Sequence, residues 1–305
     1  MIKYILLFIT TIVLASEPIT PLPKNIYIDI KKAKLGQELF FETALSKDNS
    51  TSCFSCHNVY EGGADSRKVS RGFDNKKGDI QSPTVLNARY NFKQFWNGRA
   101  KNLLEQAGGP IANPVEHNMN KESIEKVLNN SEYKFKFKKV FGTSSVKYED
   151  VIEAIVEFEK ALTTPNSKFD KYLRDEHTLS KNEKDGYILF KQYGCITCHN
   201  GINIGGNSYQ KMGTFLEYPN TQKYPDRNVI TNHEHDINVF KVPTLRNIYK
   251  TSPYFHDGAA DTLSEAIKIM AKHNLGIELT NKEITNIESF LKTLDGDKPH
   301  ILDTK

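Results

Sequence analysis

The sequence predicts a mainly helical chain of two related modules in tandem, with long loops and little strand. Three observations lead to this prediction. The pattern C-x-x-C-H occurs twice, at residues 53–57 and 195–199. A similar block of sequence follows each pattern, which is the mark of an internal repeat. Segments with apolar residues at helical spacing precede each pattern and follow the second block.

The N-terminal segment, 1–15, has the features of an export signal. Lys3 is followed by twelve uncharged, mostly apolar residues, 4–15, a length typical of a signal core and too short to span a bilayer. Val13 and Ala15 place small residues where cleavage after Ala15 requires them. The alternative is an uncleaved membrane anchor. After cleavage we expect no membrane segment, because no later stretch approaches about 18 apolar residues.

The charge of the chain is nearly balanced. The 305 residues include 41 Lys plus Arg and 37 Asp plus Glu, for a net charge of +4. Such a small net charge indicates no polyanionic partner, so we do not expect nucleic-acid binding.

The two C-x-x-C-H patterns use all four cysteines of the chain. Two disulfides are one alternative for an exported protein, and a four-thiolate zinc site is another. Both leave the adjacent histidines, His57 and His199, without a role. Covalent haem accounts for all six residues, because the thiols add to the vinyl groups and the histidine binds the iron. We therefore predict two haem c groups, attached at Cys53, Cys56, Cys195 and Cys198.

The repeat extends on both sides of the two patterns. Gly-x-x-Leu-Phe occurs in LGQELFF (35–41) and in GYILF (186–190), each fitting a helix that leads into the haem motif. The block 82–107 aligns without gaps to 242–266, which ends one residue sooner, and the spacing from proline to glycine is the same in both copies. The connection from Cys198 to Pro243 is longer than the matching one from Cys56 to Pro83.

The alignment also indicates how the two haems differ. Twelve residues after Gly258 stands Met270, on a predicted amphipathic helix, whereas Pro110 stands twelve residues after Gly98. A methionine opposite histidine raises the reduction potential and closes the iron to exchangeable ligands, as an electron store requires. Proline cannot bind iron, and Gly-Gly-Pro is expected to break the helix into a loop. The first haem then keeps an open position. Met212 is the rival ligand for the second haem.

An open haem that cleaves a peroxide needs a group to carry the proton. Glu116 could accept a proton from the peroxide and return it to the departing oxygen, if burial raises its pKa. Gln106 could donate a hydrogen bond to the same oxygens. The alternative is that Glu116 faces solvent.

The ordered set of motifs resembles the bacterial di-haem cytochrome c peroxidases over nearly all of the mature chain. The resemblance is carried by LGQELFFETALS, SCFSCHNVYEGG, SPTVLNA, QFWNGRAKNLLEQAGGPIANPVE, GCITCHNG, FKVPTLRNIYKTSPYFHDG and TLSEAIKIM. It implies an all-helical pair of cytochrome c-like domains in the periplasm that reduce hydrogen peroxide to water. Electrons would come from a small monohaem cytochrome c or a similar carrier. The expected domains are 1–15 (signal), 16–165 (peroxidatic haem) and 166–305 (electron-transfer haem).

The resemblance also implies roles for single residues. His57 would be the proximal ligand of the peroxidatic haem, and His199 with Met270 would hold the electron-transfer haem. Glu116 and Gln106 would be the distal catalytic residues. Trp96, the only tryptophan, would lie between the two haems.

Family members also bind calcium between the domains through one side-chain amide and backbone carbonyls. The matching positions are Gln81, where the usual residue is asparagine, and the carbonyls of Thr251 and Pro253. Glutamine is one methylene longer, so its oxygen would reach a cation with altered geometry.

One departure from the family concerns the loop after the first motif. Many members have a histidine there that caps the peroxidatic iron in the oxidised enzyme, and here the position is Phe73. Either the site is permanently open or another residue, such as His117, caps it.

Two other functions stay open at this point. One is a di-haem electron-transfer cytochrome without peroxidase activity. The other is a relative of the di-haem enzyme that matures a tryptophan-derived quinone, although tyrosine is expected there in place of Met270. His233 and His235 are read as a solvated loop rather than a metal site. The sequence leaves open whether the chain forms a homodimer.

Overall fold

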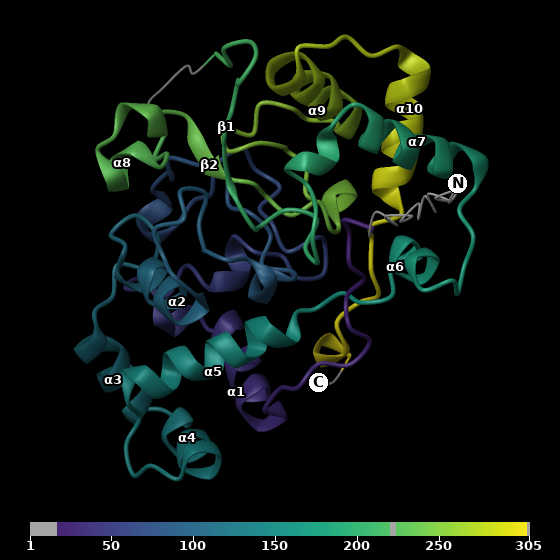
Figure 1. Cartoon of the computed structure of the whole chain (residues 1–305). Helices are drawn as coiled ribbons and strands as arrows, with labels where there is room; N and C mark the ends of the chain where they lie inside the picture. Colours follow the sequence, from purple (N-terminus) through teal and green to yellow (C-terminus); the bar gives the residue numbers. More distant parts are fainter. Residues whose placement is uncertain (1–16, 220–223, 304–305) are drawn as a thin grey trace, which may run out of the picture.

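The structure is a computed structural model that describes residues 17–219 and 224–303 (Figure 1). The predicted signal, 1–15, lies outside the described residues. Helices dominate, and the described residues contain one small antiparallel sheet, so the prediction of a mainly helical chain is confirmed. The helices are α1 (Ile30–Phe41), α2 (Leu103–Ala112), α3 (Lys121–Asn129), α4 (Tyr133–Phe141), α5 (Tyr148–Ala161), α6 (Lys168–Leu173), α7 (Lys181–Gln192), α8 (Asn228–Thr231), α9 (Leu263–Met270) and α10 (Asn281–Lys292), and the strands are β1 (Tyr209–Lys211) and β2 (Val239–Lys241).

Each half has a core in which a helix that leads into a haem motif crosses the last helix of that half. In the first half α1 crosses α5, and in the second α7 crosses α10. The glycine of the repeated Gly-x-x-Leu-Phe lies at each crossing. A Cβ on Gly36 would lie 1.8 Å from the Ala154 carbonyl oxygen, and one on Gly186 would lie 1.9 Å from that of Asn286. The repeat therefore keeps glycine because the two helix backbones touch there.

The two halves meet along a seam that follows the repeat. The N–H of Gln81 donates to the carbonyl of His256 (2.9 Å), and the N–H of Lys241 donates to the carbonyl of Trp96 (2.7 Å). The repeat alignment pairs Gln81 with Lys241 and Trp96 with His256, at the same offset that pairs the prolines of the two blocks. Each copy thus makes the same backbone bond to the other copy, and the seam has an approximate two-fold symmetry.

A single buried hydroxyl lies where this symmetry brings the copies together. Oγ1 of Thr164 accepts a hydrogen bond from Nδ2 of Asn87 (2.7 Å) and another from Nδ2 of Asn247 (2.8 Å). Both asparagines are repeat anchors, and both adopt the left-handed conformation, which asparagine tolerates. Thr164 joins the two modules at the end of the first.

Both ends of the described chain pack on the opposite half. Ile19 is part of the apolar core of the second half, and the N–H of Leu22 donates to Asp170 (3.1 Å). Ile301 and Leu302 are part of the core of the first half. In Figure 1 the purple N-terminal segment runs from beside α6 down to α1, and the yellow C-terminal turn ends near α1. The boundary at 165/166 stays a prediction, and these two segments cross it.

The longer connection of the second copy forms the sheet. Strands β1 and β2 pair antiparallel with Gln210 opposite Phe240. Across residues 17–219 and 224–303 the helices are all too short or too polar to cross a membrane.

Candidate active site

The two C-x-x-C-H motifs fold into the same turn. A 3₁₀ turn begins at the first cysteine of each motif, Cys53–Ser55 and Cys195–Thr197. The N–H of His57 then donates to the carbonyl of Cys53 (3.0 Å), and that of His199 to the carbonyl of Cys195 (3.0 Å). The turn thus holds both thiols and the imidazole of each motif on one short loop.

Burial favours the neutral form of both histidines, the form that binds a metal. Burial lowers the pKa of His57 and lowers that of His199 to about 4, while the backbone carbonyls of Pro83 and Pro243 act in the opposite direction. Nδ1 of His57 lies 3.2 Å from the carbonyl oxygen of Gly63. A neutral imidazole that donates from Nδ1 has its Nε2 lone pair available to a metal.

The thiols fit haem better than the two alternatives. All four cysteines are free, and within the described ranges no cluster of histidine, cysteine or carboxylate side chains could hold a metal ion, so the pairs do not form a four-thiolate zinc site. Cys53 packs against the apolar core of the first half and Cys195 against that of the second. Burial is the main cause that raises the pKa of each, that of Cys195 to about 11. Two separate thiol pairs, each with one cysteine against an apolar core and next to a buried histidine, suit two porphyrins.

The structure corrects one prediction about the first copy. Gly-Gly-Pro does not break the helix into a loop, because α2 continues through Pro110 to Ala112. Proline lacks an N–H, but it stands in the last turn, where it removes only one helical bond. The last carbonyls of the helix are satisfied by the following chain, since the N–H of His117 donates to the carbonyl of Pro110 (3.2 Å) and that of Met119 to the carbonyl of Ile111 (2.8 Å). The two copies therefore differ in one side chain on equivalent helices, not in helix against loop.

Glu116 lies on the turn after α2 and faces the first motif. Burial raises its pKa, and a hydrogen bond from Nδ2 of Asn113 (2.6 Å) and the charge of Arg99 act in the opposite direction. Its own charge contributes to the raised pKa of Cys53 and Cys56, after the larger effect of burial. The carboxylate is partly buried and acts on both thiols of the first motif, which weighs against the alternative that Glu116 simply faces solvent, and its catalytic role stays a prediction.

Arg99 acts on Glu116, and Gln106 lies on the helix that precedes it. Gln106 is half-buried on α2. The Arg99 guanidinium lies 3.4 Å above the centre of the Phe95 ring, and that ring lies against Gly109 on α2. Arg99 was missed at the sequence level, because nothing in a lone arginine predicts that its charge reaches Glu116.

Trp96 and Met270 lie together at the seam. Both pack against the buried cluster of Met212, Tyr218, Tyr224 and Phe240. Nε1 of Trp96 donates to the carbonyl of Gln81 (2.8 Å), which fixes the indole between the halves. Met270 is the last residue of α9 and is followed by a π-helical turn, Ala271–Leu275. Because both methionines are in the cluster, the choice between them stays a prediction.

The position of the capping histidine is held by Phe73, which cannot bind iron, and His117 is anchored through Nδ1, which leaves only its Nε2 for a ligand. Nδ1 of His117 lies 3.1 Å from the carbonyl oxygen of Leu45, and the side chain is buried. Phe73 begins a short turn, Phe73–Asn75, whose first N–H donates to the carbonyl of Glu116 (2.6 Å).

The residues predicted to bind calcium share the seam. Gln81 bonds to His256, on the segment that also contains Thr251 and Pro253. Nε2 of Gln81 donates to the carbonyl of Asp65 (3.4 Å), which leaves Oε1 as the side-chain atom for a cation. The structure does not otherwise test this site.

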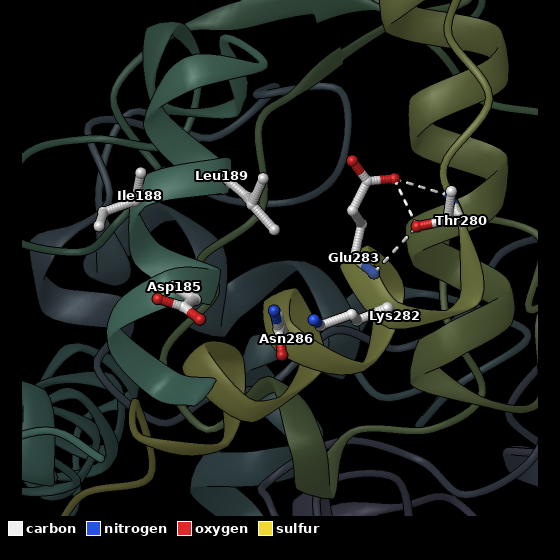
Figure 2. A pocket seen from close by; sticks show the side chains of 7 residues that line it. All are labelled: Asp185, Ile188, Leu189, Thr280, Lys282, Glu283 and Asn286. Carbon is white, nitrogen blue, oxygen red and sulfur yellow. Dashed lines mark hydrogen bonds between the residues drawn. The ribbon is translucent and has the colours of Figure 1, made fainter. Parts of the chain in front are cut away.

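A surface groove between α7 and α10 contains none of the predicted site residues. Figure 2 shows Glu283 bonded to Thr280 in the capping box that begins α10, with Asp185 and Leu189 on the facing helix. Glu283 is fully occupied by this cap and by the Tyr193 hydroxyl. The groove is a by-product of the helix start.

Comparison with known proteins identifies the family. Residues 30–178 match the family model described as di-haem cytochrome c peroxidase. The cytochrome c551 peroxidase of Nitrosomonas europaea is 48% identical over 93% of this chain and 86% of its own length. The chain belongs to the di-haem cytochrome c peroxidase family. The corresponding protein of Pseudomonas aeruginosa is 38% identical over 94% of this chain and 87% of its own.

The di-haem peroxidase fold agrees with this assignment. A crystal structure of a MauG-like protein associated with microbial copper homeostasis superposes with a TM-score of 0.81 and 25% identity, over 93% of this chain and 94% of that one. The predictions of the family, of a mainly helical fold and of an oxidoreductase are therefore confirmed. Family membership also implies two haem c groups.

Proposed function

We propose that this di-haem peroxidase works in the periplasm and reduces hydrogen peroxide to water with electrons from a small monohaem cytochrome c or a similar soluble carrier. The observation that carries the proposal is the pair of unlike haem sites on one repeat. Glu116 lies close enough to the first C-x-x-C-H turn to act on its thiols, whereas Met270 ends α9, the counterpart of α2 in the second copy. On this proposal one site has a proton carrier and the other an iron ligand.

His57 with Cys53 and Cys56 would hold the first haem, and His199 with Cys195 and Cys198 the second. When bound, these groups supply an open iron for the peroxide and a store for one electron. The reaction takes two electrons and two protons and forms two waters. The remaining tasks, positioning the peroxide and moving the protons, are carried out by side chains of the protein.

Glu116 suits the movement of the proton. Its carboxyl is mostly buried, so its pKa is raised towards the range where it can both accept and return a proton. Asn113 holds Oε1 in place. The charge of Arg99 limits the rise of the pKa and so keeps the carboxylate able to accept. Gln106 would position the peroxide.

The position of Trp96 suits electron transfer between the two halves. Its indole is bonded to Gln81 on one side, and its carbonyl accepts from Lys241 on the other. The ring centres of Trp96 and Phe240 are 6.4 Å apart, at the edge of the cluster that contacts Met270.

The first experiment measures intact mass and turnover of the exported protein. We expect two covalently bound haem masses above the mature chain, and peroxide-dependent oxidation of a reduced monohaem cytochrome c. One haem, or none after acid–acetone extraction, would overturn the haem assignment. Two haems without peroxide turnover would favour the electron-transfer cytochrome instead.

The quinone-maturing alternative is less well supported. The methylamine utilization protein MauG of Methylophilus methylotrophus is 28% identical to this chain, against 48% for the peroxidase of Nitrosomonas europaea. Met270, where tyrosine is expected in that class, also weighs against it.

Calcium at Gln81, Thr251 and Pro253 is part of the proposal. Titration of chelator-treated protein with calcium, followed by isothermal calorimetry, tests it, with Gln81→Ala as the variant that should lose the ion. Unchanged calcium binding by that variant would remove Gln81 from the ligand set. Fractionation of cells tests the periplasmic location, and light scattering tests the homodimer.

A further inference from the structure

Three separate segments meet at the backbone of Glu116. They are residues 45–48, which precede the first haem motif, the turn Phe73–Asn75 that follows it, and residues 115–117 after α2. None of the contacts between them is visible in the sequence, because the segments are far apart along the chain. Together they surround the backbone of the proposed proton carrier.

The turn Phe73–Asn75 contacts the other two segments. The N–H of Phe73 donates to the carbonyl of Glu116 (2.6 Å), and the N–H of Asp74 donates to Oδ2 of Asp48 (3.0 Å). Asp74 and Asn75 both have left-handed φ values, 56° and 54°. Aspartate and asparagine tolerate that conformation better than other side chains, but two such residues in a row are uncommon, so outside contacts help the turn to keep its shape.

Asp48 is fixed before it reaches the turn. Its Oδ1 accepts from the hydroxyl and the N–H of Ser50 (2.7 and 3.1 Å) and from the hydroxyl of Ser46 (3.4 Å). These local bonds leave Oδ2 directed at Asp74. The Ser50 hydroxyl, followed by the backbone N–H of Asp74, lowers the pKa of Asp48 to about 2, so the carboxylate is charged across the working range of pH.

Gly72 lets the turn lie against Glu116. A Cβ at this position would lie 2.3 Å from the carbonyl oxygen of Val115 and 2.6 Å from Cα of Glu116. Both distances are shorter than a real Cβ contact allows. Any other residue would therefore push the turn away from Glu116, although the φ of Gly72, −114°, is open to all residues.

The remaining side of the site is closed by the first segment. The N–H of Lys47 donates to the carbonyl of His117 (3.0 Å), and the His117 ring bonds to Leu45. The backbone of Glu116 and His117 is thus held from two directions, through the turn and directly from residues 45–47.

We propose that Asp48 and Gly72 are positioning residues that lock the turn Phe73–Asn75 against Glu116, so that the carboxyl is held in place before any electron arrives. The inference rests on the proposed function for the role of Glu116. It adds that the contacts of Asp48 and Gly72 with this turn, which we call the latch, set the geometry of the first site. No conformational change driven by reduction is needed. Neither residue touches the substrate.

The test compares Asp48→Asn and Gly72→Ala with two matched controls in the two-haem protein. Asp74→Asn removes the same charge from the turn but keeps the N–H that bonds to Asp48. Gly78→Ala adds the same methyl group in the same loop, where the nearest atom would be the Ser70 carbonyl oxygen at an ordinary 3.5 Å. Haem content and melting temperature establish that each variant folds.

The hydrogen-exchange rates of the Phe73 and Asp74 amides measure directly whether the turn is held in place. We expect the exchange rate to rise at least about tenfold in Asp48→Asn and Gly72→Ala, and to stay unchanged in both controls. An unchanged rate in Asp48→Asn, or an equal rise in the controls, would overturn the latch. This readout does not depend on turnover.

Turnover then reads the effect on Glu116. We expect kcat to fall about 10- to 100-fold in both latch variants, because misplacement of a catalytic group by about 1 Å costs up to about 100-fold. When Glu116 is already replaced by glutamine, the two latch substitutions should not lower kcat any further. A further loss there would show a general structural role and overturn the proposal. A wild-type protein without peroxide turnover would instead sink the proposed function, and hydrogen exchange alone would decide the latch.

Discussion

At the scale of single residues, two carboxyls of the first half, Glu116 and Glu159, differ in whether their oxygens have hydrogen-bond partners. Glu116 has Asn113 and Arg99 beside it, and its pKa is raised only in part. Glu159, on α5, has an oxygen with no partner, and burial raises its pKa to about 8. Its charge also contributes to the raised pKa of Cys53, after the larger effect of burial. Near the first motif the chain thus has one carboxyl suited to exchange protons and a second whose pKa burial raises to about 8.

Glu116→Gln should slow peroxide cleavage by about 10²- to 10⁴-fold, because glutamine keeps the shape but carries no proton. Stopped-flow mixing of peroxide with the half-reduced enzyme measures the rate. Glu122→Gln, an exposed carboxylate on α3, is the control and should be silent. Equal rates in the two variants would show that Glu116 is not the proton carrier.

Phe73→His should convert the oxidised enzyme to a low-spin form that requires reduction before turnover. The wild type has no imidazole at this position, so we expect a substantial high-spin ferric signal in electron paramagnetic resonance, and cyanide binding without reduction. Two purely low-spin signals in the wild type would contradict an open site. His117 would then be tested first, although the Leu45 carbonyl holds its ring.

Glu159→Gln should remove a pH dependence of stability. The folded pKa, about 8, lies above the ordinary value of 4.5, so the folded state binds the proton more tightly. Stability is therefore fully present below pH 4.5 and falls as the pH rises to about 8, with a slope approaching about 1.4 kcal/mol per pH unit. Denaturant unfolding of wild type and variant across this range measures the difference, and parallel curves would refute the buried neutral acid.

At the scale of elements, α2 and α9 are the same helix used for two purposes. Asn102 and Thr262 begin them in the same way, each accepting from the N–H of a glutamate three residues later, Glu105 and Glu265. Pro110 and Met270 then occupy equivalent positions. Both helices form despite this exchange, because the position lies near their ends and few helical bonds lie beyond the proline. The exchange does change the ligand chemistry, because methionine can bind iron and proline cannot.

Met270→Ala should lower the potential of the second haem and abolish or severely reduce turnover, while the spectrum of the first haem is retained. Redox titration followed by absorption measures the potential. Met212→Ala is the matched control, since Met212 packs in the same cluster. If Met212→Ala lowers the potential and Met270→Ala does not, the two copies do not correspond beyond Gly258.

At the scale of the whole molecule, the repeat makes the interface between its own copies. Gln81 and Lys241 exchange equivalent backbone bonds with His256 and Trp96. This arrangement sets Trp96 between the halves without a dedicated interface. The terminal segments reinforce it, because each packs on the opposite half.

Thr164→Val should destabilise the protein by about 2 to 6 kcal/mol, because two buried amide donors, on Asn87 and Asn247, lose their acceptor at about 1 to 3 kcal/mol each. Chemical denaturation of the two-haem protein measures the loss. Thr143→Val is the control, since the Thr143 hydroxyl is buried without a partner and should be dispensable. Equal stability of the two variants would mean that Thr164 does not join the halves.

The chemistry of the two haem sites was readable from the chain because it is local. A thiol, a thiol and a histidine within five residues form one turn wherever they occur, and the repeat exposes what the copies share and where they differ. Family, fold class and the unlike partners Met270 and Pro110 all follow from such short-range patterns. The prediction of a loop at Gly-Gly-Pro was wrong because the cost of proline depends on its place in a helix.

Contacts between distant segments required the folded structure. Burial of Glu116 and Glu159, the approach of Arg99, the bond from Asp74 to Asp48 and the shared hydroxyl of Thr164 all join residues far apart in sequence. A pKa is set by desolvation and by neighbouring charges, and both are properties of the packed molecule. The chain therefore specifies which groups can react, and the packing of its two copies sets where each one is held and in which protonation state.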